Sequence, residues 1–101
     1  MLFRSLDKAG LGLDDVAVVE VNEAFACVAT QTARDLGLED RWDDVNPNGS
    51  GISLGHPLGA TGTRILASLL SELDRRDARY GVATMCIGWG MAICGVVERL
   101  A

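Results

Sequence analysis

The stretch GSGISLGHPLGATG, residues 49–62, holds five glycines and the only histidine of the chain, His56. Glycine lets the backbone adopt positive φ and approach a ligand closely, and Pro57 pushes His56 toward an extended conformation. We therefore expect a short apolar strand at 52–54, a rigid turn presenting the imidazole, and a helix carrying apolar residues at helical spacing over 65–73. Such a His is well placed as a base or hydrogen-bond donor, although a structural turn with a solvent-facing His explains the pattern equally well.

Composition restricts the classes of function. The chain has 101 residues, 49% of them apolar and 23% charged, which is ordinary for one globular domain. Its net charge of −5 and its lack of a basic cluster argue against a nucleic-acid surface. We expect no membrane span, because no apolar run reaches the ~18 residues that a membrane helix needs.

The cysteines indicate the compartment. Cys27, Cys86 and Cys94 form no CxxC pair, so the signatures of zinc sites and dithiol redox sites are absent. An odd number of cysteines without a signal peptide suggests free thiols in a reducing compartment. We expect a cytoplasmic protein with no metal and no bound cofactor.

The first third of the chain predicts a helix, a strand and a second helix. An apolar stripe predicts a short helix that ends at Gly10; its members are Leu2, Phe3, Leu6 and Ala9. The β-branched run at 16–21 predicts a strand buried on both faces, which is typical of parallel sheets.

The polar pair after this strand has two interpretations. Asn22 is a good N-cap and Glu23 suits the first turn of a helix that continues to about residue 36 and stops at Gly37. Capping alone explains Asn22. The carboxyl end of a strand is, however, also where ligands bind in open α/β sheets.

Further along the chain, we expect Trp42 to anchor a polar connection, residues 45–49 to form a short strand and a turn, and Thr61 to cap the helix that follows. The final apolar segment, 82–97, is broken by Gly88-Trp89-Gly90, which predicts a hairpin.

The three cysteines differ in their predicted surroundings. We expect Cys27 and Cys94 to act as small buried hydrophobes. Cys86 lies at the end of the first hairpin strand, just before the turn. The glycines beside it would leave its thiol accessible and offer free backbone N–H groups, the donors that a developing oxyanion needs.

Three motifs in series resemble the C-terminal motifs of thiolases. They are NEAF at 22–25, GHPLGATG at 55–62 and CIGWG at 86–90, and both order and spacing match. Each motif alone is weak, but the series is highly specific. The resemblance covers essentially the whole chain and implies an α/β fold similar to most of the second of the two thiolase halves: a mixed sheet of about four strands packed by helices and ending in a β-hairpin.

The resemblance also implies a chemistry, the reversible Claisen condensation of an acyl-CoA with acetyl-CoA. His56 matches the histidine that activates the nucleophile and helps to bind a thioester oxygen. Asn22 matches the asparagine that holds a water in that oxyanion hole, and Glu23 would support its loop. Cys86 matches the cysteine that moves the α-proton, and Gly88 the glycine whose N–H completes the other oxyanion hole.

The physical chemistry fits these roles. Removing the α-proton of a thioester needs a base and a way to spread the enolate charge. A thiolate near a protonated histidine and backbone N–H groups is held at a usable pKa. The substrates would be acyl-CoA and acetyl-CoA, with fatty-acid β-oxidation slightly favoured over biosynthesis.

The chain departs from the thiolase pattern in two respects. The acyl-accepting cysteine of thiolases lies in the first half, and the chain at 1–101 resembles a C-terminal domain without that half and without its own first strand. A gap or a rearranged sheet with unpaired edges would follow. The second departure is that Trp89 and Ala92 stand where glycine is usual, so a positive φ at Trp89 would strain the backbone, and its indole could crowd the thioester site.

Three hypotheses follow. The chain is part of a thiolase that works with a complementary N-terminal half or as a homo-oligomer, or it is an inactive remnant or interaction module. An unrelated hydrolase that uses Cys86 and His56 is the third, and no orienting third residue supports it.

Overall fold

The computed structural model describes residues 1–100 as an α/β fold. The helices and strands, in chain order, are α1 (Leu2–Ala9), the 3₁₀ turn η1 (Leu13–Asp15), β1 (Val16–Val21), α2 (Ala26–Asp35), the 3₁₀ segment η2 (Glu39–Asp44), α3 (Gly51–Leu54), α4 (Thr61–Arg75), β2 (Tyr80–Gly88) and β3 (Met91–Glu98). Among residues 1–100, no helix is both long and apolar enough to cross a membrane.

The sheet is mixed, as predicted, with the order β1-β2-β3. β1 and β2 are parallel, and their ladder runs from the pair Val16–Tyr80 to the pair Val21–Thr84. β2 and β3 form the predicted antiparallel hairpin. β1 pairs directly with β2, so the sheet is continuous between these two strands. We expected either a gap or a rearranged sheet, and the gap does not occur between β1 and β2.

The sheet has three strands within the described part of the chain, not about four, because two predicted strands do not form. Residues 52–54 belong to the helical turn α3, and residues 45–49 contribute only a bridge between Val45 and Val19. Asn46 explains the second difference. Its side-chain amide accepts a bond from Val21 N–H (2.7 Å) and donates one to Val21 C=O (2.8 Å), which takes the place of strand pairing.

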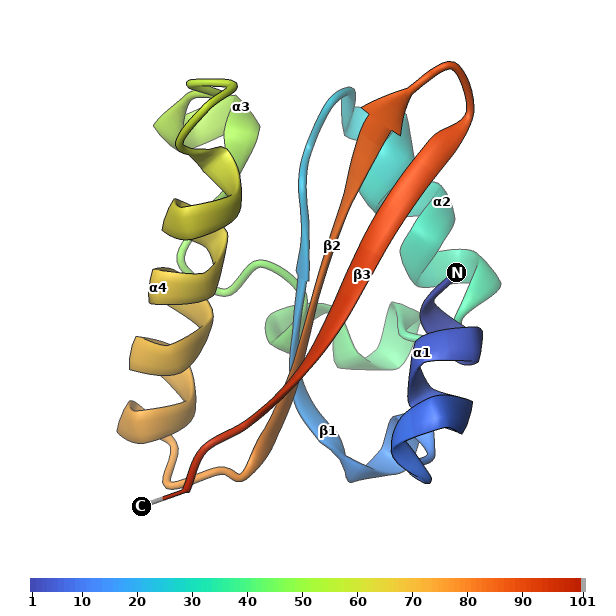
Figure 1. The fold of residues 1–101 in the computed structure, drawn as a ribbon, viewed down its shortest axis with the longest axis vertical. Coiled ribbons are helices and arrows are strands. Elements are labelled where there is room, and N and C mark those ends of the chain that lie inside the picture. Colours follow the sequence, from blue (N-terminus) through green and yellow to red (C-terminus); the bar gives the residue numbers. More distant parts are fainter. Residues whose placement is uncertain (101) are drawn as a thin grey trace.

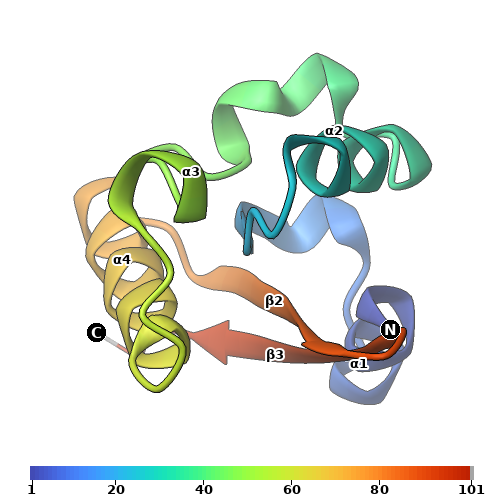
Figure 2. The same ribbon diagram turned by 90° about the horizontal axis from the view of Figure 1, so that it is seen from above.

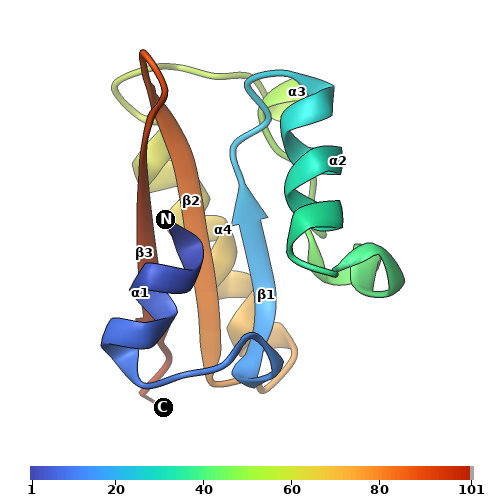
Figure 3. The ribbon, with the colours of Figure 1, turned by 90° about the vertical axis from the view of Figure 1, so that its right-hand side faces the viewer.

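Helices cover both faces of the sheet. Figure 3 shows α1 in front of the strands, α4 behind them and α2 beside β1. Leu2 and Leu6 of α1 and Ala33 of α2 pack into one apolar cluster with β1 and β2, while Leu69 and Leu73 of α4 pack on the other face around Val18. The apolar stripes of α1 and α4 therefore position the helices that surround the candidate site.

One glycine is required by this packing. A Cβ at Gly81 in β2 would lie 2.5 Å from Leu69 Cδ1 of α4, so the close approach of α4 to the sheet requires a residue without a side chain at this position.

The prediction that Trp42 anchors the connection is wrong, because this residue in η2 is 48% exposed.

The hairpin turn has the positive φ at Trp89 on which the expected strain depends. Both residues between β2 and β3 have positive φ, 53° at Trp89 and 79° at Gly90, as in a type I′ turn. The indole is fully exposed, so no packing within the described chain compensates for the strained backbone.

We expect Trp89→Asn to raise the free energy of unfolding by about 0.5–1 kcal/mol, because asparagine tolerates positive φ at this turn position. Urea unfolding followed by circular dichroism measures the change. Gly90→Ala is the matched control and should lower stability by about 1 kcal/mol. A Trp89→Asn protein no more stable than the parent would show that the turn carries no strain.

Candidate functional site

The candidate site lies where β1 and β2 end, beside the beginnings of α2, α3 and α4 and the hairpin turn, at the upper end of the molecule in Figure 1. Asn22 directly follows β1, and its backbone N–H donates to Thr84 C=O of β2 at 2.9 Å. Asn22 is 1% exposed, and both of its side-chain amide atoms lack a hydrogen-bond partner among residues 1–100. A buried amide in this state is a ready donor and acceptor for a bound molecule or water.

Asn22 is not the predicted N-cap. α2 begins only at Ala26, and Phe25 is its N-cap residue, with extended backbone angles (φ −140°, ψ 155°). The chain therefore continues past β1 for several residues before it turns into the helix. The predicted position of Glu23 in the first turn of that helix is wrong for the same reason.

Glu23 instead contacts α3. Its Oε1 accepts a hydrogen bond from Ile52 N–H (3.2 Å). The approach is close, since a Cβ at Gly51 would lie 3.2 Å from Glu23 O and 3.4 Å from Asn22 Oδ1. Glu23 and Gly51 thus hold α3 against the Asn22 segment.

His56 is exposed on the turn between α3 and α4, and Figure 2 shows α3 beside the beginning of α4. Its Nδ1 lies 2.7 Å from Thr61 Oγ1, and that hydroxyl donates to Pro57 C=O at 3.0 Å. When the hydroxyl hydrogen is given to Pro57 C=O, a neutral His56 donates from Nδ1 to Thr61 Oγ1 and keeps the Nε2 lone pair free. This tautomer is the one that a general base at Nε2 needs.

Thr61 has a different role from the predicted cap. It is the first residue of α4 and fully buried, and the N-cap residue is Ala60. The Thr61 hydroxyl orients the imidazole instead. Its spacing five residues after His56, across a proline turn, is the signal in the sequence that could have shown this.

The three thiols occupy different environments. Cys86 is exposed in β2, before the hairpin turn as predicted, and faces Ala92 of β3 across the ladder. Cys94 is half-buried, and burial raises the pKa of its thiol, which favours the neutral form. Cys27 is exposed near the start of α2, so the prediction of a small buried hydrophobe is wrong there.

One cavity of about 360 Å³ brings two of the predicted site residues together. Asn22 and Cys86 both line it, with Thr84 and Ala92 from the sheet and apolar residues of α1 and α2. Among residues 1–100, His56 and Gly88 lie outside its lining. Gly88 is at the end of β2, where it pairs with Met91 and has φ 128°.

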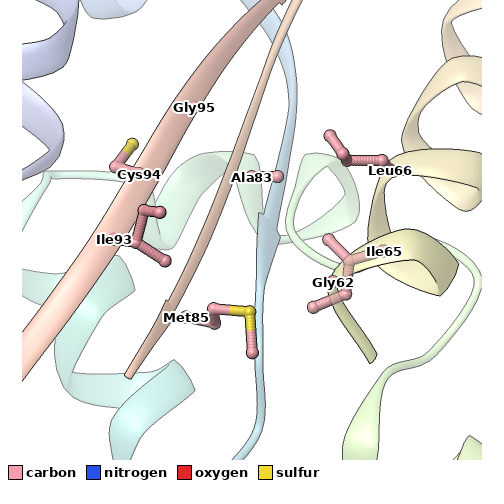
Figure 4. Close-up of a pocket in the computed structure, with 8 residues that line it drawn as sticks. All are labelled: Gly62, Ile65, Leu66, Ala83, Met85, Ile93, Cys94 and Gly95. Carbon is pink, nitrogen blue, oxygen red and sulfur yellow. The ribbon is translucent and has the colours of Figure 1, made fainter. Parts of the chain in front are cut away.

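A second cavity, of about 220 Å³, lies between α4 and the hairpin. Figure 4 shows Ile65 and Leu66 of α4 across from Met85 and Ile93 of the strands. Its only ionisable lining group within residues 1–100 is the Cys94 thiol, so it suits an apolar group and offers no acid–base pair.

Sequence reasoning missed two charged residues beside the site. Glu20 is fully buried in β1, and burial raises the pKa of its carboxyl to about 7; Arg64 of α4 opposes this shift, while the carboxylates of Glu23 and Glu72 add to it. The sequence offered a signal for each residue. Glu20 is a carboxylate inside the apolar run at 16–21, and Arg64 is the only charged residue in the stretch 61–71.

Comparison with known proteins gives the family. Residues 2–99 match the profile of the family described as "Thiolase, C-terminal domain". The chain is 53% identical over 97 residues to a 3-ketoacyl-CoA thiolase of Vibrio cholerae (strain ATCC 39541), covering 95% of this chain and 25% of that protein. An acetyl-CoA acetyltransferase of Syntrophomonas wolfei is 48% identical over 97 residues, with 96% and 24% covered. A 3-ketoacyl-CoA thiolase of Bacillus subtilis (strain 168) is 52% identical over 95 residues, with 94% and 24% covered.

The chain thus spans about a quarter of the length of these relatives. The match nevertheless includes all three motifs that carry the candidate site, since it runs from residue 2 to residue 99. The chain therefore belongs to the thiolase family, to whose C-terminal domain residues 2–99 correspond.

Proposed function

We propose that this chain is the C-terminal part of an acyl-CoA C-acyltransferase that catalyses the reversible Claisen condensation of an acyl-CoA with acetyl-CoA. In the forward direction, a proton leaves C2 of acetyl-CoA and the resulting carbanion attacks an acyl thioester. The new C–C bond forms as the acyl C–S bond breaks, which gives a 3-ketoacyl-CoA and a free thiol. The reverse reaction is thiolytic cleavage.

One observation carries this proposal: Asn22 and Cys86, 64 positions apart in the sequence, line one cavity at the carboxyl ends of β1 and β2. Cys86 is the group we propose to take and return the α-proton, and its exposure leaves the sulfur open to a substrate. The unpartnered amide of Asn22 fits the binding of a water beside a thioester oxygen.

His56 is proposed to deprotonate the thiol that accepts the acyl group. Its support is the Thr61 contact, which occupies Nδ1 and leaves Nε2 without a partner among residues 1–100. The accepting thiol would come from a complementary thiolase N-terminal half, because a nucleophile for acyl transfer must lie next to its base and none of the three cysteines bonds to the His56 ring within residues 1–100. The N–H of Gly88 is proposed to bind the enolate oxygen.

Co-expression with a thiolase N-terminal half tests this function. We expect the paired proteins to cleave acetoacetyl-CoA in the presence of CoA, and each half alone to show no turnover. The assay follows the loss of the acetoacetyl-CoA enolate absorbance. No turnover in any pairing with a folded partner would count against the proposal.

An inactive interaction module is the second candidate, and the observation that favours it is the fully exposed Trp89, which directly follows Gly88 in the strained hairpin turn. The indole would then block the thioester site. Grafted into a full-length thiolase, this segment should gain activity on Trp89→Gly if the module is inactive because of the indole. Full activity with the tryptophan in place would remove this candidate.

A further inference from the structure

The cavity of about 220 Å³ between α4 and the hairpin, the α4-side cavity, has no part in the proton transfers proposed above. Its floor is one face of the hairpin, where the cross-strand pairs Ala83–Gly95 and Met85–Ile93 lie on the same side of the sheet. The first turns of α4 lie opposite this floor (Figure 4). The sulfur of Cys94 points away from α4, and this side chain packs in the cluster on the α1 side of the sheet. Among residues 1–100, therefore, no ionisable side chain faces the α4-side cavity.

Small residues provide the space. A Cβ at Gly95 would meet nothing within 4 Å, and a Cβ at Gly62 would lie 3.8 Å from Met85 Sδ, so the two glycines keep both ends of the cavity open. The apolar side chains at its mouth are partly in water, since Leu66 is 42% and Ile93 is 56% exposed. An apolar group bound here would remove that surface from water, which is favourable.

The α4-side cavity begins beside the His56 turn. Gly62 directly follows Thr61, whose hydroxyl oxygen lies 2.7 Å from His56 Nδ1. Met85 directly precedes Cys86, but side chains alternate along a strand, and the Met85 sulfur is on the side of α4. The cavity that Cys86 lines is on the side of α1 and α2. The sheet therefore separates the two cavities, and the His56 turn lies on the side of the apolar one.

We propose that the α4-side cavity holds the unbranched hydrocarbon chain of the acyl group whose transfer His56 assists, and that its volume limits this chain to about six to eight carbons. A water molecule takes up about 30 Å³ in the liquid, and a methylene group is of similar size, so the cavity accommodates about seven such groups. The acyl group lies along α4, and acetyl-CoA approaches the strand ends from the side of Cys86.

This inference deepens the proposed function, on which it rests for the identity of the substrate. The two can fail separately. Binding of an alkyl chain needs no turnover, and cleavage of acetoacetyl-CoA needs no chain in the α4-side cavity, because the acetoacetyl group is short.

The length dependence of binding is the first test. S-Alkyl-CoA thioethers with unbranched chains of four to ten carbons cannot be turned over, and calorimetry measures their affinity for the 101-residue chain. We expect the Kd to fall about threefold for each added carbon from butyl to octyl, and by less than about twofold in total from octyl to decyl. An affinity that rises by the same factor through decyl would indicate an open apolar surface and would overturn the proposal.

The three methionines locate the bound chain. Met85 faces the α4-side cavity, Met1 lines the cavity that Cys86 shares, and Met91 is exposed beside the hairpin turn. In a protein labelled with ¹³C-methyl methionine, S-octyl-CoA should shift the methyl resonance of Met85 and leave those of Met1 and Met91 in place. A shift at Met1 without one at Met85 would put the chain in the other cavity, and either this result or the absence of any shift would refute the assignment.

Gly95→Val should fill the end of the α4-side cavity that lies farther from His56. The new side chain enters free space, and valine suits a strand, so the variant should fold. We expect it to weaken S-octyl-CoA binding about tenfold and S-butyl-CoA binding by less than about twofold, because the shorter chain does not reach Gly95. Ala67→Val is the matched control, since Ala67 is exposed on α4 outside the cavity lining and should keep the parental affinities. Parental affinity for S-octyl-CoA in Gly95→Val, or equal weakening in both variants, would contradict the proposal.

Met85→Ala gives an independent test of opposite sign should Gly95→Val fold poorly. Removing the thioether side chain enlarges the α4-side cavity, so the gain in affinity with chain length should continue for about two further carbons. S-Decyl-CoA should then bind about tenfold more tightly than S-octyl-CoA. A Met85→Ala protein whose affinity still levels off at octyl would show that this cavity does not set the length of the bound chain.

Discussion

Cys86→Ala should lower the rate of acetoacetyl-CoA cleavage by about 10³-fold in a thiolase assembled from this chain and an N-terminal half. The thiol is proposed to carry the proton to and from C2 of acetyl-CoA, and the alanine side chain has no group that can replace it. The exposed position of Cys86 in β2 makes a folding defect a poor explanation for such a loss, because little packing is removed.

The control for this prediction is Cys27→Ala. Cys27 is also exposed but lies in α2, outside the lining of the cavity shared by Asn22 and Cys86. The Cys27→Ala variant should retain the parental rate of acetoacetyl-CoA cleavage. Steady-state assays of both variants, with circular dichroism to verify folding, decide the matter. Equal rates for Cys86→Ala and the parent would exclude Cys86 from proton transfer.

The second large effect concerns stability and pH. Glu20 has a folded-state pKa of about 7 against an ordinary value of 4.5, chiefly because burial disfavours its charged form. Between these values the folded chain keeps a proton that the unfolded chain has released. Rising pH therefore favours unfolding, and Glu20 should lower the free energy of unfolding by up to about 3 kcal/mol between pH 4.5 and pH 7.

Glu20→Gln should remove this dependence and make the chain more stable than the parent at pH 8. Urea unfolding at half-unit pH intervals measures it, with Glu39→Gln as the surface control. Glu72 does not interfere with this measurement. Hydrogen bonds from Arg75, Asn48 and Arg76 lower the pKa of its carboxyl to about 2, so its contribution to the free energy of unfolding is lost only as the pH falls below 4.5. A parent whose stability is constant from pH 4.5 to 7 would contradict the prediction.

Local patterns in the sequence predicted most of the regular structure. The stripe on α1, the β-branched run of β1, the apolar spacing of α4 and the glycine break of the hairpin all describe interactions between near neighbours along the chain. The hairpin is the clearest case, because the break at Gly88-Trp89-Gly90 is a local signal, while the type of the turn and the positive φ at Trp89 became known only from the structure. The family resemblance was also available from three local motifs, and the match over residues 2–99 confirms it.

The tertiary structure alone decided the contacts between segments that are distant in the sequence. Asn46 replaces strand pairing through its bonds to Val21, and Gly51 packs on Asn22, so the predicted strands at 45–49 and 52–54 and the predicted cap at Asn22 did not form. No periodicity encodes these contacts, because the free energy of a hydrogen bond or a buried charge depends on which groups the fold brings within reach and how far it excludes water.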